Sequence, residues 1–206
     1  STFPSNFHTM LDRIRRFGTE TAIYGISTIL GRFLNFLLVP FYTNVLPTED
    51  YGIVAYIFSL IAFANVVYGY GMESAFFKYS STLEIGTPKQ NFSTPFVALA
   101  ASSTLLSVLL TLLAFPVATA IALPAHHAGV VVYAAWILFF DAISLVPFAS
   151  LRMEGHAAVF AGLKFLNIAI NVAANLVFLL IFRAGIEGIF LSAVIASATT
   201  FVLLLP

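Results

Sequence analysis

Long apolar segments, separated by short polar ones, occupy most of this 206-residue chain. An α-helix needs about 20 apolar residues to cross the ~30 Å hydrocarbon core of a bilayer. Continuous runs such as VVVYAAWILFF (130–140) do not alternate between apolar and polar residues, so they predict helices rather than barrel strands. The pattern therefore predicts an all-α integral membrane protein. Its six transmembrane helices are expected at about 21–46, 51–77, 94–123, 129–151, 157–182 and 188–206.

The first 20 residues have an amphipathic pattern. Phe7 and Leu11 share one face of a helix, while Arg13 and Arg16 fall on the other face. This arrangement predicts an interfacial segment, residues 1–20, that lies on the inner membrane surface. A cleaved signal peptide is the alternative, but the apolar run that follows is too long for one.

Basic residues are concentrated in alternate connections. The segments 78–91 and 152–156 contain Lys or Arg, whereas 47–50 and 124–128 contain neither and 183–187 contains Arg183 alone. Since positive residues mark cytoplasmic loops, the N-terminus is expected in the cytoplasm. Residues 21–206 would then form a six-helix transmembrane lobe.

Composition narrows the range of functions. Hydrophobic residues make up 60% of the chain and charged residues 9%, against about one quarter charged in soluble domains. The net charge is zero, which argues against nucleic-acid binding, and there is no cysteine for disulfides or thiolate metal sites. No Ser-His-Asp set, phosphate-binding loop or carboxylate pair indicates catalysis. We therefore expect no enzymatic activity, no metal site and no bound cofactor.

Arg32 lies in the middle of the apolar stretch ILGRFLNFLLVP (29–40), about 15 Å along the first span. A charge near the bilayer centre costs at least ~2.5–3.5 kcal/mol. Asp141, at a comparable depth in the fourth span, is the natural partner. The two residues either form a structural contact between helices or belong to a wet cavity that receives an anionic ligand.

A polar stripe follows the fifth span. Its members are 3, 4 and 4 residues apart and share one helical face: Lys164, Asn167, Asn171 and Asn175. Such asparagines either join neighbouring helices through hydrogen bonds or line a hydrated cavity. In the second case, Arg32 and Lys164 would bind an anion. Asn35 and the stripe would hydrogen-bond hydroxyl-rich groups such as sugars.

Glu73 and Lys78 lie near the cytoplasmic end of the second span. Gly69 and Gly71, just before them, permit a kink or a close helix contact. Glu73 and Lys78 are either a local ion pair at a helix end or, together with Asp141, residues that couple or gate transport.

Two segments, YGISTILGRFLNFLLVPFYTNVLPTEDYG (24–52) and GYGMESAFFKYS (69–80), resemble the opening of bacterial polysaccharide-export proteins. LRMEG (151–155) and AGIEGIF (184–190) fit the same family in the same order. These proteins belong to the multidrug/oligosaccharidyl-lipid/polysaccharide transporter superfamily, and the resemblance covers nearly the whole chain.

The resemblance implies a transporter of the bacterial inner membrane. It would flip undecaprenyl-pyrophosphate-linked oligosaccharide to the outer leaflet for O-antigen, lipopolysaccharide or exopolysaccharide synthesis. Two lobes would alternate around a central cationic cavity, and this chain would be the N-terminal lobe without the second. Arg32 matches in type an arginine that contacts pyrophosphate in relatives. Membrane lipids and a polysaccharide polymerase are the other expected partners, with H⁺ or Na⁺ as the coupling ion.

Two other functions stay open. A cation-coupled multidrug antiporter of the same superfamily would have an acid-dominated cavity, whereas cations outnumber acids here at mid-depth. A membrane enzyme acting on prenyl phosphates would cluster carboxylates for magnesium at one membrane face. The acidic residues of the inner side are instead scattered in the sequence: Asp12, Glu73, Glu84 and Glu154.

Overall fold

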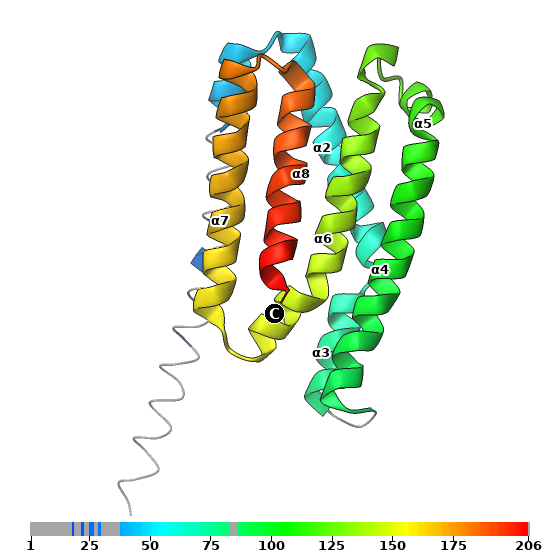
Figure 1. Cartoon of the computed structure of the whole chain (residues 1–206), viewed down its shortest axis with the longest axis vertical. Coiled ribbons are helices and arrows are strands. Elements are labelled where there is room, and N and C mark those ends of the chain that lie inside the picture. Colours follow the sequence, from blue (N-terminus) through cyan, green and yellow to red (C-terminus); the bar gives the residue numbers. More distant parts are fainter. Residues whose placement is uncertain are drawn as a thin grey trace, which may run out of the picture.

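A computed structural model describes residues 18, 22, 25, 26, 29, 38–82 and 86–205 of the chain. This part is all-α, with helices that run side by side (Figure 1). Residues 38–45 are helical. The elements that follow are α2 (Thr48–Gly69), α3 (Met72–Thr82), α4 (Pro88–Leu112), α5 (Ala114–Ala120), the 3₁₀ turn η1 (Ala125–His127), α6 (Gly129–Met153), α7 (Ala157–Leu176), the π-helical segment η2 (Val177–Ile181) and α8 (Gly185–Leu204).

Five stretches of the described chain are long and apolar enough to cross a membrane. They correspond to the second to sixth predicted spans: Thr48–Thr82, Pro88–Leu112, Ala125–Met153, Ala157–Ile181 and Gly185–Leu204. The first predicted span and the interfacial segment 1–20 lie largely outside the described residues. The protein is therefore a multi-pass membrane protein, and the first of its six predicted spans stays a prediction.

Helix α6 lies at the centre of the bundle and packs against α4 and α8, with α2 and α3 beside it (Figure 1). Half of the most apolar 18-residue stretch of this span is buried, as expected for a helix that is hydrophobic on all sides. The outer helix α4 buries much less and exposes large apolar side chains, such as Leu112 at 76%. In a bilayer, these outer faces contact lipid.

The second span is not one straight helix. Tyr70 and Gly71 have φ values of +26° and +78°, so α2 ends there and α3 begins. A Cβ added to the preceding glycine, Gly69, would lie 3.1 Å from Leu145 Cδ1 of α6. The glycines thus provide both features that the sequence predicts, a kink and a close helix contact.

The third span differs from the predicted bounds 94–123. It begins earlier, at Pro88, because Thr87 forms a capping box with Gln90. The Gln90 amide donates to Thr87 Oγ1 at 3.3 Å, and the Thr87 amide donates to Gln90 Oε1 at 3.0 Å. The span is also divided at Leu113, where α4 ends and α5 starts.

The connections are sorted by end in the way that the charge pattern predicts. The α3–α4 and α6–α7 connections, with Lys89 and Arg152 in the adjoining helix ends, lie at one end of the bundle (Figure 1). The α5–α6 and α7–α8 connections lie at the other end.

Candidate functional site

Four helices meet around the carboxylate of Asp141, on α6. Ser197 of α8 donates a hydrogen bond to Asp141 Oδ1 at 2.9 Å, and the Asn65 side chain of α2 forms another. Lys164 of α7 acts electrostatically on the same carboxylate. These four residues, which we call the Asp141 cluster, place a hydrogen-bonded carboxyl group inside the membrane-spanning bundle.

Arg32 and Asn35 lie outside the described residues, so the predicted pairing of Arg32 with Asp141 stays a prediction. The partners of Asp141 within the described chain come instead from α2, α7 and α8. The sequence analysis did not identify Ser197, because a single serine in an apolar helix carries no distinctive signal.

The ammonium group of Lys164 lies against aromatic rings in the N-terminal half of α7. Its Nζ is 4.2 Å from the ring centroid of Phe148 and 6.0 Å from that of Phe160. The side chain is exposed at the bundle surface. The ring attracts the cation, and the exposed position leaves its N–H donors accessible, so Lys164 can contact an anion.

The asparagine stripe of α7 is built into helix contacts. Asn167 Nδ2 donates to Thr200 Oγ1 of α8 at 2.9 Å. Asn175 Nδ2 donates to the backbone oxygen of Asn171 at 2.8 Å and to its Oδ1 at 2.9 Å. The Asn167 bond joins two helices, as the first interpretation of the stripe describes, whereas the Asn175 bonds stay within α7. Sugar binding by these asparagines stays a prediction.

Asn175 has an unusual setting. It is 0% exposed, and its Oδ1 atom has no hydrogen-bond partner among the described residues. The helix changes to π geometry two residues later, at Val177. Isolated π-helical turns inside α-helices are frequent at functional sites.

Glu73 forms an ion pair with Arg152 at the end of α6. This ion pair joins two helices, whereas one of the two sequence interpretations places Glu73 with Lys78; gating by Glu73 and Lys78 stays a prediction. Lys78 is exposed and its Nζ lies 5.8 Å from the ring centroid of Tyr79. Arg152 was missed as a functional candidate, although its place at the same predicted membrane face as Glu73 was a usable signal.

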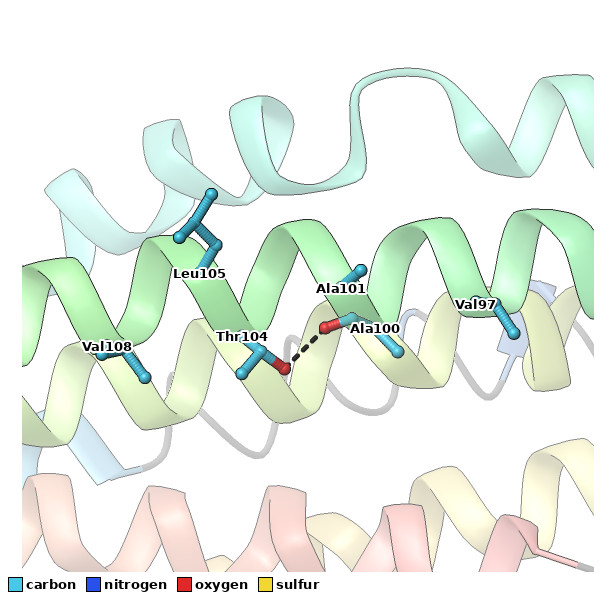
Figure 2. Close-up of a pocket in the computed structure, with 6 residues that line it drawn as sticks. All are labelled: Val97, Ala100, Ala101, Thr104, Leu105 and Val108. Carbon is cyan, nitrogen blue, oxygen red and sulfur yellow. Dashed lines mark hydrogen bonds between the residues drawn. The ribbon is translucent and has the colours of Figure 1, made fainter.

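An open apolar groove runs along α4 (Figure 2). Six residues line it: Val97, Ala100, Ala101, Thr104, Leu105 and Val108. The one hydroxyl, of Thr104, donates to the Ala100 carbonyl of its own helix at 2.6 Å (Figure 2). The groove therefore offers a ligand little besides hydrocarbon and shares no residue with the Asp141 cluster. Among the described residues, no group of three His, Cys, Asp or Glu is placed to bind a metal ion.

Comparison with known proteins gives one match. The model of the family described as "Polysaccharide biosynthesis protein" matches residues 17–205. Neither the curated proteins nor the solved structures contain a match. The matched region includes the five described spans and all four residues of the Asp141 cluster. The chain therefore belongs to the polysaccharide biosynthesis protein family, which is of the flippase type that its sequence resembles.

Proposed function

We propose that this protein flips undecaprenyl-pyrophosphate-linked oligosaccharide from the inner to the outer leaflet of the bacterial inner membrane. The observation that carries this proposal is a cluster of polar and ionisable side chains inside a membrane-spanning bundle of the polysaccharide biosynthesis protein family. The six-helix region, residues 21–206, would be one lobe of a two-lobed carrier with its N-terminus in the cytoplasm. Residues 1–20 would rest on the inner membrane surface.

Cationic side chains supply the contact with the pyrophosphate. Arg32 and Lys164 would approach it from the first and fifth spans, and the exposed ammonium of Lys164 supports this role. Asn35 and Asn171 would hydrogen-bond the sugars, together with Asn167 and Asn175 when their helix contacts rearrange. The prenyl chain, which is as apolar as the bilayer, would stay in lipid.

Asp141 gives the cycle a means of coupling to an ion gradient. Its carboxylate is held by Ser197 and Asn65 and feels the charge of Lys164. Binding of pyrophosphate to Lys164 would withdraw that charge from Asp141, which would then accept H⁺ or Na⁺. Glu73 and Lys78, both on α3, would take part in gating.

A cell-based test distinguishes a loss of transport from a loss of membrane insertion. Lys164→Ala in the complete protein is expected to lower surface polysaccharide in a strain that lacks its own copy, by about tenfold or more if a charged hydrogen bond is lost. Lys89→Ala, an exposed cation at the same end of the bundle, is the matched control. Arg32→Ala and Asn171→Leu complete the set. Normal surface polysaccharide in all three site variants, at normal expression, would remove the proposed binding surface.

A further inference from the structure

The surroundings of Arg152 leave room for an anion in addition to the carboxylate of Glu73. Its guanidinium is paired with Glu73 of α3 and lies 5.4 Å from the ring centroid of Phe77 and 5.5 Å from that of Phe160. Aromatic rings on two helices, α3 and α7, therefore hold the planar group at the end of α6. The side chain remains 33% exposed, which leaves it within reach of a ligand at the membrane face.

Arg152 has donors that Glu73 does not use. A guanidinium carries five N–H donors in a fixed fork that fits carboxylate or phosphate. Only one of its nitrogens, Nη2, bonds to Glu73. The Nε atom is buried and has no hydrogen-bond partner among the described residues.

A second cation lies close to Arg152. Lys164 and Arg152 both contact the ring of Phe160, with centroid distances of 6.0 Å for Nζ and 5.5 Å for Cζ. The two positive groups also repel each other electrostatically, while Glu73 and Asp141 attract Lys164. The two cations beside the Phe160 ring are therefore balanced by two carboxylates, those of Glu73 and Asp141.

We propose that Arg152 and Lys164 form a phosphate-binding site at the cytoplasmic end of the bundle, and that Glu73 is its internal counter-ion. The ligand would be a phosphate or pyrophosphate ester at the membrane surface, from a prenyl pyrophosphate or a phospholipid headgroup. A multiply charged anion binds both cations at once, whereas Glu73 pairs with Arg152 alone. Binding would release Glu73 from Arg152 and so detach α3 from α6, next to the break at Tyr70 and Gly71.

This inference rests on the proposed function, because it names where the substrate phosphate would first be bound. It also differs from a purely structural ion pair in a way that can be measured. If Glu73 competes with the ligand, removing its charge strengthens anion binding. If the pair only joins α3 to α6, removing either partner lowers both the stability of the protein and its affinity for the anion.

The test measures inorganic pyrophosphate binding to the complete protein in phosphatidylcholine nanodiscs. Arg152→Gln and Lys164→Gln are each expected to weaken binding by about tenfold or more, the loss of a charged hydrogen bond. Glu73→Gln is expected to tighten binding severalfold, and Lys89→Gln is the matched cation control with no change. Thermal unfolding of each variant is recorded alongside. Weaker binding in Glu73→Gln, parallel to Arg152→Gln, would overturn the proposal.

Two further arms identify the ligand source and separate the two proposals. Farnesyl pyrophosphate that binds more tightly than inorganic pyrophosphate supports a prenyl substrate. Competition by added phosphatidylglycerol supports a phospholipid headgroup. Unchanged pyrophosphate binding in both Arg152→Gln and Lys164→Gln, while the wild-type protein still translocates lipid-linked oligosaccharide, would remove this site alone. Wild-type protein that does not translocate that substrate would instead remove the proposed function.

Discussion

Polar side chains in this bundle bond to one another across helices, and their energies can be measured singly. Thr200 Oγ1 accepts a hydrogen bond from Asn167 and donates to its own helix at Ala196. Thr104 on α4 makes only the second kind of bond, to Ala100. The two threonines therefore form a natural comparison between an interhelical and a purely local hydroxyl.

Thr200→Val is expected to lower the free energy of unfolding by about 0.6 kcal/mol, the average worth of an interhelical hydrogen bond in a membrane protein. Asn167→Ala should give a similar loss, and the double variant should lose no more than either alone in this contact. Unfolding in mixed micelles by denaturant measures these values. Thr104→Val is the control. A loss in Thr104→Val equal to that in Thr200→Val would show that the interhelical bond adds nothing.

At the scale of elements, close helix contacts depend on Gly69 and Gly188, whereas Gly162 has open space around it. A Cβ added to Gly188 of α8 would lie 2.9 Å from Phe178 Cβ and 3.0 Å from Ala184 Cβ. Gly162 of α7 has nothing within 4 Å of an added Cβ. The α8–η2 contact therefore requires glycine, whereas α7 does not require it at 162.

Gly188→Ala is expected to destabilise the bundle by about 1–3 kcal/mol, because the atoms it meets are Cβ atoms that cannot rotate away. Gly162→Ala should be neutral or stabilising by about 0.4–1 kcal/mol, since it only reduces the freedom of the unfolded chain. Thermal unfolding followed by fluorescence-detected size exclusion compares the two. Equal melting temperatures for both variants would contradict the packing described here.

The sequence predicted the positions of the helices better than the side-chain contacts between them. Apolar length alone located the five described spans, because lipid forces backbone groups to bond within a helix. The break at Tyr70 followed from its glycine neighbours. The Glu73–Arg152 pair did not follow, since the residues are 79 positions apart and only packing of α3 on α6 brings them together. Ser197 was missed for the same reason: its partner Asp141 is on another helix.

At the scale of the whole molecule, the bundle has two chemically different ends. The end with the α3–α4 and α6–α7 connections has Lys89 and Arg152 in its helix ends, and the opposite end has His126 in η1 and Arg183 in the α7–α8 connection (Figure 1). If the basic end is cytoplasmic, the proposed substrate meets Arg152 and Lys164 on the side where it is made.

Single cysteines can test this orientation, because the chain contains none of its own. In a cysteine-free background, His126→Cys is expected to react with a membrane-impermeant maleimide in intact spheroplasts. Lys89→Cys and His156→Cys, which are exposed at the other end, should react only after permeabilisation. The reverse pattern of labelling would invert the membrane orientation and the direction of the proposed transport.

The most direct measurement of the central claim is translocation of undecaprenyl-pyrophosphate-linked oligosaccharide by the purified, complete protein in liposomes. We expect wild-type protein and Lys89→Ala to move the lipid between leaflets at the same rate, and Lys164→Ala to be slower by about tenfold or more. A wild-type protein that leaves the lipid in its original leaflet, or a Lys164→Ala variant that transports it at the wild-type rate, would contradict the account.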